Sequence, residues 1–327
     1  MLIRVPDYFT KFRCIADKCL DSCCIGWEIV IDDDAKKKYA SLNGVLGDEI
    51  AEKTKSGCFP LSSDGRCAFL DRRGLCRIIS GLGEGYLCDI CREHPRYYGV
   101  SSGMLEGGLG LGCEEAARAI LATGGKVDFC YTEHDAKYFS EDKYSELTDG
   151  IRELIYKQIR ELDREHLIAF LLALAPVCDG LTFDAVAGLE ATLPKSIDRG
   201  EFSARDTEAI LGDFMNILAQ CEALDDEWHS LIEGAKGVHI DDVIRDEGAL
   251  RSLIFYFVHR YVRECTEDMS AGQRILFSLL SALSVMAISH VMKKEESTVR
   301  AAVSYSKNIE YSTENVDLIL DELSAFL

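Results

Sequence analysis

The chain has 327 residues, 47% of them apolar, which is enough for a buried hydrophobic core in one large domain or two ordinary ones. Its formal net charge of −20 disfavours binding to nucleic acid or to an anionic membrane, so we expect neither as a partner. The charge favours basic partners, although many proteins are acidic simply to stay soluble.

The first predicted elements lie between residues 28 and 55. The stretch Glu28–Asp32 predicts a short strand. Asp32 or Asp33 can then cap a helix that runs through Tyr39 and ends near Gly44. Leu46–Lys55 can continue helically.

Residues 57–85 differ, because they are rich in Gly and Ser and carry apolar residues only in ones and twos. Such a segment buries little apolar surface alone, and a bound metal or cluster would supply the missing cross-links. Leu87–His94 predicts a helical turn that Pro95 stops.

Met104–Gly112 is glycine-rich and superficially similar to a dinucleotide-binding loop. That loop needs G-x-G-x-x-G spacing inside a βαβ unit. Here Gly108, Gly110 and Gly112 alternate and no βαβ pattern follows, so we do not expect nucleotide binding. Cys113–Thr123 predicts a helix whose first-turn glutamates suit the positive end of the helix dipole.

Helical periodicity dominates beyond about residue 130. The predicted helices are Ser145–Leu162, Glu165–Val177, Phe183–Leu193, Ser203–Leu224, Asp226–Ala235, Asp246–Glu264, Ser270–Met292, Lys294–Val303 and Thr313–Phe326. Ile275–Met292 is long enough to cross a bilayer, but its serines and its ordinary helix ends favour a buried core helix. The late cysteines are expected to be buried apolar residues: Cys130, Cys178, Cys221 and Cys265.

These patterns together predict a mainly α-helical protein. Residues 1–125 are predicted to form a cysteine-rich metal- or iron–sulfur-binding module with little regular structure, and residues 126–327 an α-helical array. The N-terminus, M-L-I-R-V-P-D-Y, lacks the apolar core of a signal peptide, so we expect a cytoplasmic protein.

Cysteine is the outlier in the composition, with 14 residues, ten of them before residue 114. Disulfide frameworks are commonest in small secreted domains, whereas clustered cysteines in a cytoplasmic chain indicate metal or redox chemistry. Nine of them form four blocks: Cys14, Cys19, Cys23 and Cys24; Cys67 and Cys76; Cys88 and Cys91; and Cys113 at a helix start. A tetrahedral zinc ion or a [4Fe–4S] cluster takes four converging thiolates. Either two sites exist, therefore, or several thiols are unligated.

For other side chains near these cysteine blocks, a role at a metal site and a purely structural role are both considered. Arg92 and Arg96 can stabilise an anionic cluster, or they can pair with the protein's own carboxylates. A lone histidine before a proline, as His94 is, is more often structural than a metal ligand. Trp27 is expected to pack over the site and limit solvent access.

Several enzyme signatures do not occur in the sequence. The radical S-adenosylmethionine triad, C-x3-C-x2-C, could begin with Cys19 and Cys23, but Gly26 stands where its third cysteine would be. The chain also has no H-E-x-x-H, no G-x-S-x-G and no P-loop.

The cysteine blocks and their neighbours, taken in order, resemble a known family. They read C-x4-C-x3-C-C-x-G-W-x-I from Cys14, C-x-F-L from Cys67, L-C-x-I from Leu75, L-G-E from Leu82, L-C-x2-C-R-x2-P-R from Leu87 and G-C-x-E-A-A-R from Gly112. This order resembles the flagellin lysine-N-methylase family, whose N-terminal part is similar to a wider group of cysteine-rich zinc- or iron-chelating domains. The resemblance covers about residues 5–123.

The resemblance implies a bacterial cytoplasmic enzyme that methylates lysines of flagellin or of another lysine-bearing protein. Its methyl donor would be S-adenosylmethionine, and an iron–sulfur cluster would take part. By this resemblance the metal ligands are the nine cysteines of the four blocks. The cofactor-binding residues are Cys19, Cys23, Cys24, Cys67, Cys76, Cys91, Arg92 and Arg96.

His94 departs from the family pattern, which has Tyr at that position, and no catalytic residue is assigned. Two alternatives stay open beside the methylase. One is a non-enzymatic zinc- or iron-binding structural or interaction protein. The other is a redox or metal-handling protein that uses the surplus thiols. Zinc and an iron–sulfur cluster both suit the thiolates.

Overall fold

The computed structural model describes residues 2–19, 22–101, 103–134, 145–179, 204–224, 226–263 and 270–327. Its contacts divide the chain into two compact units, each built from segments that are distant in sequence. The helical unit comprises Met1–Lys11, Tyr98–Gly108 and Ala117–Leu327, and the cysteine unit comprises Phe12–Tyr97 and Leu109–Ala116. The domain division at residue 125 stays a prediction.

Short elements make up the cysteine unit. They are η1 Ala16–Lys18, β2 Ile29–Val30, α2 Asp33–Ala40, α3 Val45–Lys53, β3 Cys58–Phe59, α4 Arg77–Leu82, η2 Glu84–Tyr86 and α5 Asp89–Glu93. β2 and β3 pair in antiparallel fashion, with Ile29 opposite Phe59. Residues 57–85 therefore contain more regular structure than expected, since β3 and α4 both lie in them.

The core of this unit is small and mostly aliphatic or aromatic. Its buried residues are Ile29, Ile31, Ala35, Tyr39, Ile50, Phe59, Phe69, Ile78, Leu87 and Cys88. Phe59 and Phe69 meet edge to face, with ring centroids 5.5 Å apart. The Tyr39 hydroxyl, buried beside them, donates a hydrogen bond to the backbone carbonyl of Tyr86 at 2.7 Å.

The carboxylate of Asp32 holds the starts of two helices. Its Oδ1 accepts a hydrogen bond from the Ala35 backbone N–H at 2.9 Å, in the first turn of α2, which confirms the predicted cap. Its Oδ2 accepts one from the Asp89 N–H at 2.7 Å, at the start of α5. Burial raises the pKa of Asp32, but these backbone hydrogen bonds lower it more, so the net shift is downward.

The helical unit contains the remaining elements, some of which continue across the unit boundary. They are β1 Leu2–Pro6, α1 Asp7–Lys11, β4 Arg96–Ser101, β5 Met104–Leu109, α6 Glu114–Leu121, β6 Phe129–Glu133, α7 Ser145–Glu161, α8 Arg164–Asp179, α10 Ala204–Leu218, α11 Asp226–Ala235, α12 Ile240–Val243, α13 Glu247–Tyr261, α14 Ala271–Met292, α15 Ser297–Tyr305, η4 Ser306–Glu310, α16 Thr313–Leu323 and η5 Ser324–Phe326. The part of the chain that is described is thus mainly helical, as predicted.

A four-stranded sheet in this unit was not predicted. Its strand order is β4-β5-β1-β6, in which β1 runs parallel to β5 and antiparallel to β6. The glycine-rich segment therefore lies partly in a strand, β5. α6 and β6 follow β5, but β6 runs opposite to it, so these elements do not make a parallel βαβ unit.

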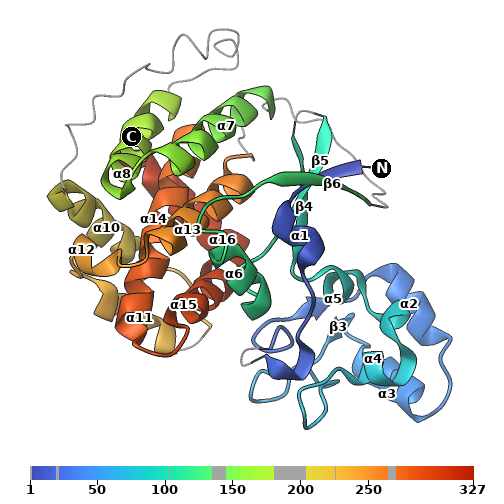
Figure 1. Cartoon of the computed structure of the whole chain (residues 1–327). Coiled ribbons are helices and arrows are strands. Elements are labelled where there is room, and N and C mark those ends of the chain that lie inside the picture. The colour runs from blue at the N-terminus through green and yellow to red at the C-terminus, as the bar shows by residue number, and fades with distance from the viewer. Residues whose placement is uncertain are drawn as a thin grey trace. The chain divides into compact units, whose positions relative to one another are not determined.

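α14 passes through the middle of the helices of this unit and contacts α8, α10, α11, α12, α13, α15 and α16 (Figure 1). Its N-terminus carries a capping box between Ser270 and Gln273. Among the described helices it is the one long and apolar enough to cross a membrane, and 83% of its most apolar window is buried within the fold. The prediction of a buried core helix is confirmed.

Most other predicted helices of residues 145–327 are present, with ends shifted by a few residues. Phe183–Leu193 lies outside the described residues, as does Cys265. Cys178 and Cys221 are buried as expected, whereas Cys130 is only half-buried because it lies on the edge strand β6.

We expect Asp32→Ala to lower the free energy of unfolding of the cysteine unit by about 2 kcal/mol, because two helix starts lose a hydrogen-bond acceptor. Amide hydrogen exchange should then speed up by roughly tenfold or more in both α2 and α5. Asp33→Ala is the matched control, since Asp33 is 86% exposed and forms a solvent-exposed ion pair with Lys36. Faster exchange in α2 alone would contradict the double role of Asp32.

Candidate functional site

The nine cysteines of the four blocks all belong to the cysteine unit. Cys113 is separated from the others in sequence by residues 98–108, which belong to the helical unit, and the chain returns at Leu109–Ala116. The Gly110 N–H donates to the Pro95 carbonyl at 2.7 Å and ties this returning segment to the end of the third block. The fold thus gathers thiols that span 100 residues of sequence.

Backbone hydrogen bonds join the first and second blocks. The Cys67 N–H donates to the Cys24 carbonyl at 2.9 Å, and the Gly26 N–H donates to the Gly65 carbonyl at 3.0 Å. Gly26 has a φ of +91°, a conformation that L side chains rarely adopt. Glycine therefore serves to turn the chain directly after the adjacent cysteines Cys23 and Cys24.

The second and third blocks share one apolar cluster. Cys88 is a buried member of it, and Cys67, Cys76 and Cys91 pack against it while partly buried. Trp27 packs against the same cluster, as predicted, and its indole Nε1 donates to the Cys23 carbonyl at 2.7 Å. This packing limits the access of water to these thiols.

One group of thiols consists of Cys14, Cys19, Cys23 and Cys113, which influence one another electrostatically. Burial raises the pKa of Cys19 to about 12, and the neighbouring thiols and Glu114 add to this. Burial also raises the pKa of Cys113 to about 11. The backbone N–H groups of Ala116 and Glu115 at the start of α6 act in the opposite direction, as a helix N-terminus should, but burial is the larger effect.

A second group consists of Cys24, Cys67, Cys76, Cys88 and Cys91, and Cys23 links it to the first group because it interacts with Cys24 and Cys67. A hydrogen bond from the Cys91 thiol lowers the pKa of Cys88, whereas the pKa of Cys91, which holds the shared proton, is raised. The hydrogen bond from Cys23 likewise lowers the pKa of Cys24, and burial raises that of Cys67. Each of these two thiol–thiol hydrogen bonds favours the ionised form of one partner.

The thiols suit a metal in their chemistry, but they do not form a closed site in this conformation. The Sγ atoms of Cys23 and Cys24 lie 4.0 Å apart, close to the roughly 3.8 Å edge of a zinc–thiolate tetrahedron with 2.3 Å bonds. In the part of the chain that the structure describes, however, no three His, Cys, Asp or Glu side chains are placed to hold one metal ion. Metal binding by these residues stays a prediction.

The two arginines of the third block have partners of different kinds. Arg92 donates to Asp89 and, at 3.3 Å, to Glu93, and its side chain is 45% exposed. Arg96 lies over the ring of Phe12, with its guanidinium carbon 5.4 Å from the ring centroid. The ring of His94 lies 6.0 Å from that of Trp27, and the His94–Pro95 peptide is cis.

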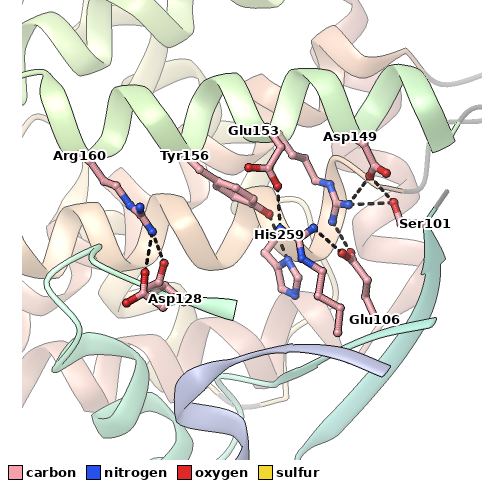
Figure 2. Close-up of polar contacts among 11 residues, drawn as sticks. Ser101, Glu106, Asp128, Asp149, Glu153, Tyr156, Arg160 and His259 are labelled. Atoms are coloured by element: carbon pink, nitrogen blue, oxygen red, sulfur yellow. Dashed lines mark hydrogen bonds and ion pairs between the residues drawn. The ribbon is translucent and has the colours of Figure 1, made fainter. Parts of the chain in front are cut away.

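A buried ionic network in the helical unit was not predicted (Figure 2). Arg152 on α7 is 1% exposed and donates to Glu106 at 2.7 Å and to Ser101 at 2.8 Å. The other oxygen of Glu106 accepts from Arg4 on β1 at 3.0 Å. Burial raises the pKa of Glu106, but Arg152, His259 and Arg4 outweigh it and hold the pKa at about 2.

His259 on α13 completes the network. Its Nε2 lies 3.2 Å from the Gly107 carbonyl and its Nδ1 3.1 Å from the Tyr156 hydroxyl. Since a carbonyl only accepts, Nε2 carries the proton and Nδ1 accepts from Tyr156. Burial lowers the pKa of His259 to about 3, opposed by Glu106 and assisted by Arg152 and Arg263. The ring is therefore neutral, and it ties α7, α13 and β5 together instead of exchanging a proton.

Two sequence signals for this network were available. Arg152 interrupts a helix face that carries Ile151, Ile155 and Ile159, and Glu106 stands inside an otherwise apolar and glycine-rich strand. A charged residue at a buried position has to be paired, so each of these predicts an opposite charge nearby. Sequence spacing alone does not identify the partner.

Comparison with known proteins adds to this geometry. The chain is 31% identical over 154 residues to flagellar biosynthetic protein FliU of Salmonella muenchen, a match that covers 42% of this chain and 91% of that relative. The chain belongs to the FliU family.

Lysine-N-methylases of Salmonella typhimurium and Salmonella choleraesuis are relatives of this FliU-family chain. Each is 32% identical over 126 residues, which is 36% of this chain. The matched region spans only 31% of the length of these lysine-N-methylases. No protein-family model and no solved structure matches the chain.

We expect the free energy of unfolding of the helical unit to fall as the pH drops below about 6.5, the usual pKa of histidine. The pKa of His259 is lowered to about 3 in the folded protein, so below 6.5 the unfolded chain binds a proton that the folded chain excludes. The stability that depends on neutral His259 is fully present above about pH 6.5 and is lost progressively as the pH falls toward 3. Glu106, with its pKa depressed to about 2, adds a second loss below about 4.5.

Urea unfolding, followed by fluorescence of the buried Trp228 with Trp27 replaced by Phe, measures this dependence. His259→Gln should flatten the dependence of the free energy of unfolding on pH between about pH 6.5 and 4.5, because the titrating imidazole is gone. The loss of stability below about pH 4.5 that comes from Glu106 should persist. The His259 assignment is wrong if wild type and variant differ by the same free energy at every pH in that range.

Proposed function

We propose that this protein is a protein-lysine N-methyltransferase that acts on flagellin, with S-adenosylmethionine as methyl donor. The observation that carries the proposal is membership of the FliU family together with 32% identity to two proteins named lysine-N-methylase. One relative is named for flagellar biosynthesis and the others for lysine methylation. A lysine of a flagellar protein is the substrate that accounts for both names. The net charge of −20 suits a substrate that presents lysines.

The proposal includes a metal ion or an iron–sulfur cluster on the thiols of the cysteine unit. Thiolate-only donor sets suit zinc and [4Fe–4S] clusters alike. The candidates are Cys14, Cys19, Cys23 and Cys113 in one group and Cys24, Cys67, Cys76, Cys88 and Cys91 in the other. When bound, the group would cross-link short segments that share only a small apolar core.

The chemistry of methyl transfer sets what the rest of the chain must do. The lysine amine must be neutral to act as a nucleophile, and it must lie in line with the methyl group of the donor. The protein therefore needs a place that holds the aliphatic lysine side chain and accepts the proton or charge of its amine. In the helical unit His259 is unsuited, since it is buried and both of its nitrogens are occupied.

Metal analysis of anaerobically purified protein tests the cysteine unit. We expect iron with acid-labile sulfide, or stoichiometric zinc, and we expect Cys88→Ser to lose most of it because a buried member of the thiol group is removed. Cys58→Ser is the matched control, since Cys58 lies in the same unit, is half-buried and stands outside the four blocks. Equal metal content in the two variants would argue against metal binding by these blocks.

Incubation with radiolabelled S-adenosylmethionine and flagellin tests the activity. We expect label on flagellin lysines with wild-type protein and with Cys58→Ser, and a loss of at least about tenfold with Cys88→Ser. A non-enzymatic metal-binding interaction protein would keep its metal, bind no S-adenosylmethionine in calorimetry and transfer no label. That combination of results would replace the methylase proposal with this alternative.

A further inference from the structure

In the helical unit α10 contacts both α11 and α12 (Figure 1). A cleft there is lined by α10, the end of α11 and the segment before α12. Its cavity volume is about 70 Å³, and it is partly open to solvent. A cleft of this size admits one extended side chain and is too small to enclose a nucleoside. The lining residues that matter here are Glu208, Leu211, Gly212, Met215, Val238 and His239.

Gly212 lies inside α10 although packing does not require a glycine there. A Cβ atom at this position would meet no heavy atom of the described residues within 4 Å. Glycine in a helix interior costs roughly 1 kcal/mol relative to alanine. The missing side chain leaves the cleft open, so the helix gives up stability at the position where a larger residue would fill the space.

Glu208 provides the charge of the cleft. Its Oε1 accepts a hydrogen bond from the Ile240 backbone N–H at 2.9 Å and lies 3.4 Å from His239 Nδ1. Oε2 makes no hydrogen bond to the part of the chain that is described. The hydrogen bond from the Ile240 N–H lowers the pKa of Glu208; desolvation opposes it and His239 adds to it, so the net shift is downward and favours the carboxylate. Its side chain is 31% exposed, which leaves it reachable from solvent.

The lining therefore combines an apolar wall with a single anchored carboxylate. Leu211 and Met215 are buried and Val238 is half-buried, so they form the apolar floor against which methylene groups would pack, and Glu208 suits a cation at the end of such a chain. Because Oε1 is already used, one oxygen remains, which matches a compact ammonium better than the two-pronged guanidinium of arginine. We propose that this cleft binds the side chain of a lysine residue and, resting on the proposed function, that this is a lysine of the protein substrate.

The experiment labels the methionine methyl groups with ¹³C and titrates the full chain with N-acetyl-lysine methylamide. We expect the Met215 signal, assigned with Met215→Leu, to shift on titration. N-acetyl-norleucine methylamide has the same carbon chain without the ammonium, and we expect it to shift the signal at least about tenfold more weakly. Equal responses to the two compounds, or none to either, would overturn the proposal.

Variants separate binding from folding. Glu208→Gln should weaken lysine binding about tenfold, whereas Asp213→Asn removes an equal charge one residue from Gly212 on the exposed side of α10 and should not. Gly212→Val should abolish the Met215 response while the other methionine signals stay in place. Unchanged lysine binding in Glu208→Gln or Gly212→Val, with the spectrum otherwise intact, contradicts the assignment.

The flagellin assay distinguishes this inference from the proposed function. If wild-type protein methylates flagellin and Glu208→Gln leaves the KM for flagellin unchanged, the cleft assignment is wrong and the methylase stands. If lysine shifts the Met215 signal selectively but no variant or wild type transfers label, the cleft binds lysine and the methylase proposal is wrong. A raised KM with little change in kcat for Glu208→Gln supports both.

Discussion

The helical unit depends on a helix that exposes almost no surface. Residues 271–289 of α14 are all buried, and seven other helices contact it. Such burial contributes about 1.5–3 kcal/mol for each large apolar side chain. Two of the buried serines of α14 have hydrogen-bond partners: Ser278 donates to the Arg274 carbonyl at 2.7 Å, and Ser281 accepts from Tyr305 on α15 at 2.6 Å. The same length and hydropathy that suit a bilayer are used here to organise a protein core.

The cysteine unit has no comparable helix. Its elements are two to nine residues long, and its core holds about ten buried side chains, one of them a cysteine. Backbone hydrogen bonds and the double cap of Asp32 hold its segments together. A small core stabilises a fold only marginally, so a unit of this kind gains most from added cross-links. Its accumulation of thiols is consistent with a metal in that role.

Charge is distributed differently at the two sites of interest in the helical unit. Around Glu106 the guanidinium groups of Arg4 and Arg152 each donate a hydrogen bond to one carboxylate oxygen, and the carboxylate is buried. Such a network stabilises one arrangement of the sheet and the helices. Glu208 instead has one oxygen held by the Ile240 backbone N–H, and its side chain is partly exposed to solvent. The difference between a structural and a binding carboxylate thus lies in exposure and in the number of donors, not in residue type.

Sequence patterns sufficed to predict the helical character of the described residues beyond 145, the cap at Asp32 and the four cysteine blocks, because these depend on local periodicity, capping chemistry and spacing. The sheet order, the partners of Glu106 and Arg152, and the return of Cys113 to the cysteine unit became evident only in the folded protein. Each of these joins segments dozens of residues apart, and local sequence carries no term for such pairings. The cleft beside Gly212 belongs to the same class, since a mid-helix glycine acquires meaning only when the neighbouring helices show that its Cβ would occupy open space.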